Sequence, residues 1–416
     1  MKEKKKLSLA AKTFIGFGLG IVIGIIFGEK ASIIKPLGTI FLNMIKMIVV
    51  PMVFFSIAAG VAALSDIKKL RNIGVKVVGL YAITSAISVC IGLLMANITN
   101  PGLGFDMSTL SSDAVYEAKE MPSVLDTIIN AFPSNVFVSF TQGDMLPIIV
   151  FAIFVGVALI MMGERGQKMA QGVQNLADVM YQITAIVMEF SPIGVCALLA
   201  DSVGSYGLKI FGPLGKLILT VYASDVILVL LMYVPMVALL ARFPVGKWFR
   251  SIVKVWVVTA STTSSAGTLP VTTQVTNEDF GVSPELSSFS LPLGATINMN
   301  GGCIYYAAAI VMTAQIYGMN LSAGALVNII ISTVLIAMGC PGVPGGAIIM
   351  TTILLTNMGL PLEIVGLIAG IFRLIDMANT TFNVTGDVVT TMVVARSEGM
   401  MRDSGTGYAN PEVKPS

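Results

Sequence analysis

Long runs of apolar residues limit what this chain can fold into more than any other feature does. Several runs approach or exceed the roughly 20 residues that an α-helix needs to cross a bilayer. They are Leu9–Gly28, Pro36–Leu64, Val75–Ile98, Leu146–Met162 and Pro213–Leu240. Charged residues make up 12% of the chain, which is about half their share in a typical soluble domain. The sequence therefore predicts an all-α polytopic membrane protein, surrounded by a lipid bilayer.

The basic residues predict how the chain is oriented in the membrane. They gather before the first apolar run, between the second and third runs, and after the run that ends at Leu240. The segment 106–120, which follows the third run, is acidic. By the positive-inside rule, both termini are expected in the cytoplasm, with the protein in the cell (inner or plasma) membrane. The net charge of +2 indicates no nucleic-acid partner.

Residue content argues against an enzyme. The chain has no histidine, which excludes Ser-His-Asp catalysis and histidine metal sites. The four cysteines are scattered through apolar stretches and have no CxxC spacing, so we expect them to be small buried side chains. Asp376 and Asp387 would lie about 16 Å apart on a helix, too far apart for a carboxylate dyad. No cofactor is expected.

Four later segments combine apolar arms with polar or glycine-rich centres. Trp256–Val271 surrounds a Ser/Thr/Ala/Gly run, and Leu286–Tyr317 is interrupted at Asn298–Gly302. Leu326–Leu355 surrounds Gly339–Gly346, and the last apolar segment is expected to break at Asn383–Asp387. Polar backbone at membrane depth is tolerated only inside protein or beside water. A re-entrant hairpin followed by a broken helix, repeated twice, indicates a transporter's binding site.

The last segment carries a polar stripe. Asp376, Thr380, Asn383 and Asp387 fall at i, i+4, i+7 and i+11, on one helix face, with Asn379 beside them. One interpretation is a hydrogen-bonded seam between packed helices. Two carboxylates favour the other interpretation, a cavity for an organic cation and metal ions. A channel could use similar loops, but two hairpins in series with an amine-binding acid favour a carrier.

Several motifs together resemble the glutamate transporter family, the dicarboxylate/amino acid:cation symporters. They are "SSAGTLPVT", "LPLGATINMNG", "GVPGGAI" and "DMANTTFNVTGD", with "NPG" and "SPIGV" earlier in the chain. The resemblance covers nearly the whole chain. It implies eight transmembrane helices, two re-entrant helical hairpins, inverted repeats, a homotrimer and an elevator mechanism.

The resemblance also implies a division of the chain. Residues 1–72 would form scaffold helices 1 and 2, and residues 73–98 would form helix 3 of the transport domain. Residues 99–207 would form an extracellular loop and scaffold helices 4 and 5. Residues 208–416 would complete the transport domain. Within it, helix 6 precedes hairpin 1 (about 250–280), helix 7 (about 286–318), hairpin 2 (about 322–357), helix 8 (about 361–397) and a cytoplasmic tail.

Roles for individual residues follow from the resemblance. Asp376 would hold the α-ammonium of an amino acid, and Val343 would cover the ligand as a gate. The implied substrate-binding set is Thr263, Ser264, Ser265, Gly302, Val343, Asp376, Asn379, Thr380 and Asn383. The implied sodium ligands are Tyr81, Thr84, Ser85, Gly294, Thr296, Asn298, Met299, Asn300, Asn383 and Asp387. Sodium is the expected coupling ion, with proton coupling left open, because Na⁺ prefers oxygen ligands.

The sequence departs from the acidic-substrate members of that family. They carry an arginine where this chain has Asn379 and often an acid where it has Phe372, and a usual threonine is here Gly302. Asn cannot replace a bidentate arginine. We therefore expect a neutral amino acid substrate, similar to serine, alanine or threonine. Asn300 stands where the family usually has Asp, which predicts weaker sodium binding at the site of Tyr81, Thr84 and Ser85.

Two further charged residues leave alternatives open. Arg373 is expected to extend outward or to pair with an acid, and Asp225 is one candidate for that acid. Arg373 as a displaced carboxylate clamp is the alternative. It would make the chain an acidic amino acid or C4-dicarboxylate symporter, with protons among the coupling ions. Asp225 could instead hydrogen-bond within its own helix or carry a proton.

Overall fold

A computed structural model of the protein describes residues 9–62, 71–104, 129, 131–143, 145–207, 211–340, 342 and 345–402. These residues are almost entirely helical and contain no strand. The first half contains α1 (Leu9–Phe27), the 3₁₀ helix η1 (Gly28–Ile34), α2 (Lys35–Ala62), α3 (Arg71–Thr99), α5 (Val136–Gln142), α6 (Met145–Met161), α7 (Glu164–Met188) and α8 (Ser191–Tyr206). The second half contains α9 (Phe211–Leu228), the π-helical segments η5 (Val229–Tyr233) and η6 (Met236–Leu240), α10 (Val245–Thr262), α11 (Ser265–Glu278), α12 (Pro284–Ile297), α13 (Asn300–Ile316), α14 (Ala323–Ala337), α15 (Gly346–Asn357) and α16 (Glu363–Ser397).

Some sequence predictions fall on residues outside these ranges. They include the acidic segment 106–120, the lysines within residues 1–8, the basic segment 63–70, the tail 403–416 and the predicted gate residue Val343. They therefore stay predictions.

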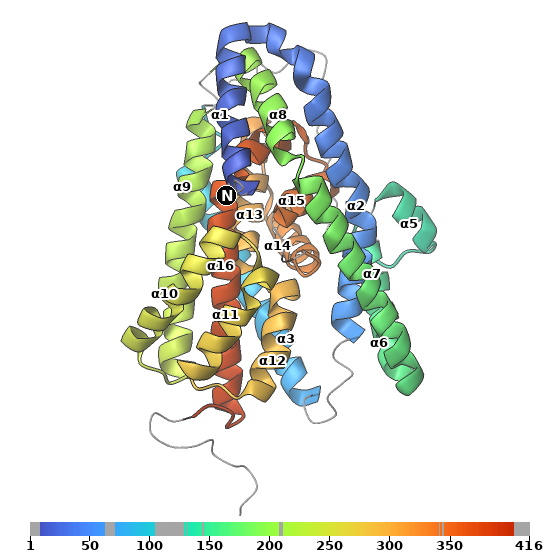
Figure 1. Cartoon of the computed structure of the whole chain (residues 1–416), viewed down its shortest axis with the longest axis vertical. Coiled ribbons are helices and arrows are strands. Elements are labelled where there is room, and N and C mark those ends of the chain that lie inside the picture. The colour runs from blue at the N-terminus through green and yellow to red at the C-terminus, as the bar shows by residue number, and fades with distance from the viewer. Residues whose placement is uncertain are drawn as a thin grey trace, which may run out of the picture.

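The helices form two groups. The peripheral helices are α1, α2 and α5–α8, with α1 packed along α8 and α2 along α6 and α7. The central helices are α3 and α9–α16, with α13 and α16 packed against α3 and against one another. Figure 1 shows α16 running down the middle of the central helices, while α1 and α2 rise beyond them at one end. The two groups meet where α8 contacts α16, α6 contacts α14, and α2 contacts α12 and α15.

A glycine stripe explains how α1 packs against α8. Gly16, Gly20 and Gly24 recur every four residues and therefore share one helix face. A Cβ atom at Gly20 would lie 2.6 Å from the carbonyl oxygen of Cys196, and one at Gly16 would lie 2.2 Å from that of Pro192. Small residues at such spacing allow two membrane helices to approach closely. This stripe therefore holds the two helices together through close backbone contact.

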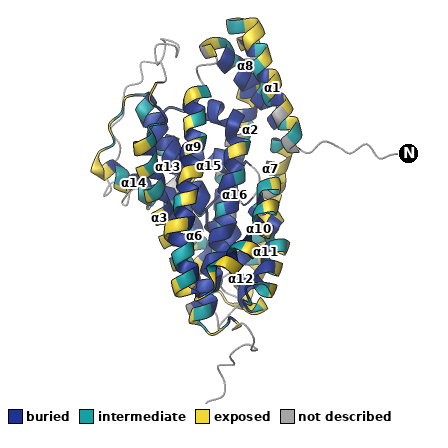
Figure 2. Ribbon diagram, turned by 90° about the vertical axis from the view of Figure 1, so that its left-hand side faces the viewer, coloured by how far each residue is buried: buried dark blue, intermediate teal, exposed yellow. Residues whose placement is uncertain are grey.

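Helix α16 is a single helix of 35 residues, so the predicted break at Asn383–Asp387 is wrong. The segment has no proline, and its glycine at 386 costs only about 1 kcal/mol relative to alanine. Thr381 and Thr385 also donate their hydroxyls to the carbonyls of Met377 and Thr381 inside the helix. Figure 2 shows that most of α16 is buried among its neighbours. The polar stripe is thus held on a rigid, enclosed rod.

Between Glu164 and Tyr206 the chain forms two helices and not one continuous span. Helices α7 and α8 are bent by 52° at their junction. Pro192 lies in the first turn of α8, where its missing N–H and its ring prevent α7 from continuing through it. Beyond the bend, α8 packs against α1 and α16, and the Ser191 hydroxyl shares a hydrogen bond with that of Thr13 of α1 at 3.0 Å.

Four helical stretches in the described part of the chain are long and apolar enough to cross a membrane: Ala11–Phe41, Ile73–Thr99, Phe211–Leu240 and Glu363–Ser397. The bent α7–α8 pair would be a fifth. Large apolar side chains are exposed on their outer faces, including Ile26 (68%), Val75 (71%) and Leu231 (71%). Such extensive apolar exposure fits a lipid environment. The prediction of a multi-pass membrane protein is supported, whereas the count of eight transmembrane helices stays a prediction.

Candidate functional site

The tip of the α10–α11 hairpin is a tight reversal lined with hydroxyls. Helix α10 ends at Thr262, and Thr263 adopts the left-handed conformation, with φ of 50°. Ser264 caps α11, because its Oγ accepts a hydrogen bond from the backbone N–H of Gly267 at 3.0 Å. The side chains of Thr263 and Ser265 are buried, at 1% and 3% exposure. The tip therefore presents hydroxyls and a helix N-terminus to the protein interior.

The tip of the α14–α15 hairpin touches this reversal. The carbonyl oxygen of Gly342 accepts hydrogen bonds from Ser264 Oγ at 2.9 Å and from the backbone N–H of Ala266 at 3.1 Å. A Cβ atom at Gly342 would lie 2.4 Å from the carbonyl oxygen of Ala295, so this close approach requires glycine. The two hairpin tips are closed against one another.

Between α12 and α13 the chain leaves the helical conformation at Asn298 and Met299, inside the predicted break. The freed Asn298 side chain donates from Nδ2 to Asp387 Oδ1 at 2.7 Å. Asn383 accepts the backbone N–H of Gly302 on Oδ1 at 3.1 Å and donates to Met299 Sδ at 3.2 Å. The polar face of α16 is therefore bound to the break by side-chain amides.

Helix α3 adds hydroxyls to the same cluster. Thr84 Oγ1 donates to Asn298 Oδ1 at 3.5 Å, and Ser85 Oγ donates to Asn300 Oδ1 at 3.1 Å. A Cβ atom added to Gly294 would lie 2.4 Å from Asp387 Oδ1 and 2.6 Å from Tyr81 Oη. These groups, together with Asn383 and Met299, come from four helices that surround Asp387. We call this set the Asp387 cluster: Tyr81, Thr84, Ser85, Gly294, Asn298, Met299, Asn300, Asn383 and Asp387.

The Asp387 cluster has the composition of a cation site. The Asp387 carboxylate is 1% exposed and accepts from a neutral amide, and it forms no ion pair with a described residue. Carboxylate, amide, hydroxyl and carbonyl oxygens are the ligands that hard cations prefer. The predicted ligand Thr296 is less involved, because its hydroxyl donates to Leu293 O within α12 at 2.7 Å.

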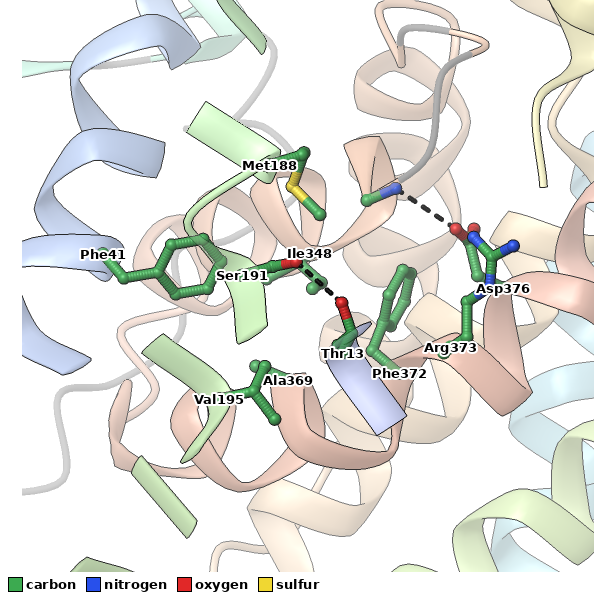
Figure 3. Close-up of a pocket in the computed structure, with 11 residues that line it drawn as sticks. Thr13, Phe41, Met188, Ser191, Val195, Ile348, Ala369, Phe372, Arg373 and Asp376 are labelled. Atoms are coloured by element: carbon green, nitrogen blue, oxygen red, sulfur yellow. Dashed lines mark hydrogen bonds between the residues drawn. The ribbon is translucent and has the colours of Figure 1, made fainter. Parts of the chain in front are cut away.

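Asp376 lies about three turns before Asp387 on the same face of α16, near the hairpin tips. Its side chain is 6% exposed, and Oδ2 accepts the backbone N–H of Gly345 at 3.2 Å. Gly345 precedes α15 on the second hairpin. Figure 3 shows this bond and the Arg373 guanidinium beside the same carboxylate. The second hairpin therefore contacts the predicted ammonium ligand through its backbone.

Arg373 does not do what its sequence position led us to expect. Its Nη1 donates to Thr263 Oγ1, and its Nη2 donates to the carbonyl oxygen of Ser261 at 2.9 Å. It therefore reaches the first hairpin tip and does not extend outward. It does not pair with Asp225 either, because both carboxylate oxygens of Asp225 lack a hydrogen-bond partner among the described residues. A cation at the C-terminus of α10 is favourable, because that end carries partial negative charge.

Three other predicted substrate residues lie nearby. Asn379 is 1% exposed, and neither its amide oxygen nor its amide nitrogen has a partner in the described part of the chain. Thr380 is buried on the same helix, and Gly302 lies where an added Cβ would meet only ordinary contacts, at 3.4 Å or more. An orphaned buried amide is costly, so Asn379 is a natural contact for a ligand.

A pocket reaches this site from the side of the peripheral helices. Its polar end is formed by Arg373 and Asp376, and its apolar wall includes Phe41, Met188 and Phe372 (Figure 3). Met188 of α7 also packs against the second hairpin, since a Cβ at Gly345 would lie 2.5 Å from its Cε. The site thus lies between the hairpin tips and the peripheral helices.

Sequence reasoning missed several contacts of the site. The backbone N–H of Gly345 and the carbonyls of Ser261 and Gly342 carry no side-chain signal in a sequence. Tyr233 was also missed: its hydroxyl donates to Phe382 O at 2.7 Å and accepts from Asn300 Nδ2 at 3.0 Å. The available signal was that Tyr233 is one of two tyrosines, with Tyr222, in the apolar span that precedes the hairpins.

Comparisons with known proteins identify the family. The family model described as "Sodium:dicarboxylate symporter family" matches residues 9–397. The chain is 34% identical over 410 residues to a proton/sodium-glutamate symport protein of Geobacillus stearothermophilus, covering 96% of each chain. It is 30% identical to a proton/glutamate-aspartate symporter of Escherichia coli, covering 94% of this chain and 93% of the relative. It is also 30% identical to a C4-dicarboxylate transport protein of Bacillus subtilis, covering 96% and 95%. The chain therefore belongs to the sodium:dicarboxylate symporter family, whose members are membrane transporters and not enzymes.

Proposed function

We propose that this chain is a cation-coupled symporter that moves a small acidic amino acid across the cell membrane. The observation that carries the proposal is that the Asp376 carboxylate and the Arg373 guanidinium both line the pocket at the hairpin tips (Figure 3). An acidic amino acid has one ammonium and two carboxylates. A site with a buried carboxylate beside a guanidinium matches that pattern, so the alternative drawn from the sequence takes precedence over a neutral substrate.

Asp376 is the proposed partner of the substrate ammonium. Its carboxylate is buried, and no lysine or arginine of the described chain forms a salt bridge with it. A buried carboxylate is strongly destabilised without a compensating positive charge. An ammonium group from the substrate supplies that charge, and a plain dicarboxylate does not.

Arg373 is the proposed partner of the side-chain carboxylate. A guanidinium has five N–H donors, and only two contacts engage them here, to Thr263 and Ser261. The remaining donors suit a carboxylate, which guanidinium binds in a bidentate manner. The α-carboxylate would be held by Ser265 and Thr380, with Asn383 linking this site to the Asp387 cluster. Relatives named for glutamate, aspartate and C4-dicarboxylates support an anionic substrate.

A neutral amino acid is the second candidate, and Asn379 favours it. The amide of Asn379 is buried with both polar atoms unpartnered. It could exchange hydrogen bonds with the hydroxyl of serine or threonine, and the space beside Gly302 would admit a small side chain. In this case Arg373 would only bind the end of α10.

Sodium is the proposed coupling ion at the Asp387 cluster, where carboxylate, amide and hydroxyl oxygens converge. The hydroxyls of Thr84 and Ser85 would form a second sodium site together with Asn300. This site would bind sodium more weakly, because Asn300 brings no formal charge. If bound sodium stabilises the closed hairpins, sodium and substrate raise one another's affinity equally.

Architecture and movement extend the proposal. Residues 1–72 and 99–207 would form the scaffold of a homotrimer, with both termini in the cytoplasm. Residues 73–98 and 208–416 would form a transport domain that moves as an elevator. The described contacts are compatible with this division, since α3 packs mainly with the central helices α9, α12, α13, α14 and α16.

The test is uptake into proteoliposomes that contain the purified protein. Labelled aspartate, serine and succinate would be compared under an inward Na⁺ gradient, and again under a pH gradient without Na⁺. Sodium-driven aspartate uptake is the expected result. Serine uptake without aspartate uptake would move the assignment to the second candidate and to Asn379. Uptake of none of the three under either gradient would contradict the proposed function.

A further inference from the structure

Helix α9 carries a carboxyl group that the proposed transport site does not use. Asp225 lies near the C-terminal end of α9, four residues before the π-helical segment η5 begins. Its side chain is 0% exposed, and neither carboxylate oxygen has a hydrogen-bond partner among the described residues. By contrast, the neighbouring Ser224 is satisfied, because its hydroxyl donates to Thr220 O at 2.7 Å. Asp225 is therefore both buried and orphaned.

Contacts on either side of Asp225 fix its depth in the molecule. Thr220 shares a hydrogen bond with Thr99 at the end of α3 at 2.6 Å, and Tyr222 donates to Leu374 O of α16 at 2.8 Å. Further along, Tyr233 donates to Phe382 O of the same helix at 2.7 Å. Asp225 falls between the last two contacts. It therefore lies at the level of the α16 segment that contains Asp376, on a helix that packs against α3, α13 and α16.

The positive side chains that the structure describes on α9 and on the helices packed against it are engaged elsewhere. Arg373 of α16 binds the first hairpin tip. Lys76 of α3 pairs with Glu398, and Arg396 of α16 donates to Ala241 O at 2.9 Å. Lys216, on α9 itself, donates to Leu103 O at 3.3 Å. None of these four cations neutralises Asp225.

The remaining titratable groups on these helices do not bond to Asp225 either. Tyr222 and Tyr233 are in electrostatic reach of it, but their hydroxyls bind backbone carbonyls of α16. On α13, the hydroxyl of Tyr306 donates to Cys340 Sγ at 3.3 Å and that of Tyr305 accepts from Thr351. The set is completed by Tyr81 and Cys90 of α3, Cys303 of α13, and Glu363, Asp376 and Asp387 of α16, none of which forms a hydrogen bond with Asp225.

A bare carboxylate in this position would be costly, so it must be neutralised from outside the chain. A sodium ion needs several oxygens around it, and the oxygens of that kind gather at the Asp387 cluster. A proton needs only one carboxylate oxygen. The segment η5 adds a change of backbone register, a feature frequent at functional sites.

We propose that Asp225 binds the coupled proton, taking it up as an O–H bond on its carboxylate and releasing it once per transport cycle. The inference rests on the proposed symport function. It assigns the proton to a residue outside both the substrate site and the Asp387 cluster. Asp225 and Tyr233 share one continuous helix, and the hydroxyl of Tyr233 forms a hydrogen bond with Asn300. Protonation of Asp225 can therefore affect the sodium ligands through the helix backbone and this hydrogen bond.

The test uses the full-length protein in proteoliposomes that contain a pH-sensitive dye. Asp225→Asn, Asp225→Glu, the matched control Ser224→Ala and the wild type would be compared in two assays. The first is exchange of external labelled aspartate for internal aspartate in symmetrical Na⁺. The second is acidification of the lumen when aspartate is added outside. We expect all four proteins to exchange aspartate. We expect loss of acidification only in Asp225→Asn, and Asp225→Glu should retain it.

Several outcomes would overturn the inference. One such outcome is that Asp225→Asn acidifies the lumen as much as the wild type does. Another is that the wild type takes up aspartate without any acidification, in which case the proposed symport function would still stand. Absence of all exchange in the wild type would contradict the proposed function itself, and this inference with it. If Asp225→Asn does not fold, a second measurement tests the inference. Infrared difference spectra between alkaline and acidic buffer are recorded for the wild type and for Asp225→Glu, and the two spectra are compared. A protonated-carboxyl band that differs between them supports the inference, and identical spectra contradict it.

Discussion

Asp376 and Asp387 lie on the same face of α16, yet their surroundings differ in kind. Asp387 is enclosed by neutral side-chain amides and hydroxyls from three other helices, beginning with Asn298 at 2.7 Å. Asp376 meets a backbone N–H of a hairpin tip at 3.2 Å and has a guanidinium beside it. The first setting is made of fixed oxygen ligands and suits a small ion. The second includes backbone from a hairpin tip, and it suits the proposed organic substrate.

The largest expected effect is at Asp387. Asp387→Asn removes the formal charge that compensates a bound cation, which should weaken sodium binding by about 3–5 kcal/mol, or roughly a hundredfold or more. The measurement is the Na⁺ concentration needed for half-maximal aspartate uptake. Asp178→Asn, a surface change on α7, is the control. An unchanged Na⁺ dependence would remove the distinction between the two carboxylates.

Asp376→Ala should abolish binding of amino acids while leaving the sodium site intact. Truncating one partner of a buried charge pair costs about 2–5 kcal/mol, or roughly 30-fold to several thousandfold. Isothermal titration of aspartate in saturating Na⁺ measures this. The comparison fails if Asp376→Ala keeps its affinity for aspartate. It also fails if the variant loses Na⁺ binding in the absence of aspartate, measured as the stabilisation of the protein by Na⁺.

Arg373→Gln separates the two candidate substrates. Loss of charge-assisted hydrogen bonds should weaken aspartate by about 1.5–3 kcal/mol, or roughly ten- to a hundredfold, and leave serine unaffected. Competition between unlabelled aspartate and serine for the same site provides the readout, with the exposed Arg165→Gln as the control. Equal losses for both amino acids would mean that Arg373 only orders the first hairpin tip.

Asn300→Asp should have the smallest effect, and in the opposite direction. A carboxylate next to Ser85 would strengthen the weaker sodium site by about 1 kcal/mol, or roughly fivefold, after its own desolvation is deducted. The Na⁺ dependence of thermal stability without substrate measures this, and Asn175→Asp on the surface of α7 is the control. A drop in Na⁺ affinity would show that Asn300 serves Tyr233 and not a cation.

Local signals predicted much of this site. The Ser/Thr run gave the first hairpin tip, "NMNGG" gave the break at Asn298, and the spacing of Asp376 and Asp387 gave the polar face of α16. These features depend on residue types within a few positions, where backbone preferences and helix periodicity act.

Long-range contacts decided the rest. The break predicted at Asn383–Asp387 did not occur, because partners on α12 and α13 satisfy those polar side chains without any change in the α16 backbone. Arg373 was expected to extend outward, but the tip carbonyl of Ser261 and the Thr263 hydroxyl, more than a hundred positions away, provide a better partner. Neither partner can be recognised from the residues around Arg373.

The carbonyl oxygen of Gly342 on the second hairpin is an acceptor shared by two donors on the first hairpin. Ser264 Oγ and the N–H of Ala266 both depend on this one acceptor. If the second hairpin moved away, two donors on the first would lose their partner together and would need water or a ligand as a new acceptor. A carboxylate arriving at that moment offers them new acceptors. This shared acceptor thus makes an empty, open site less stable than either a closed one or a filled one.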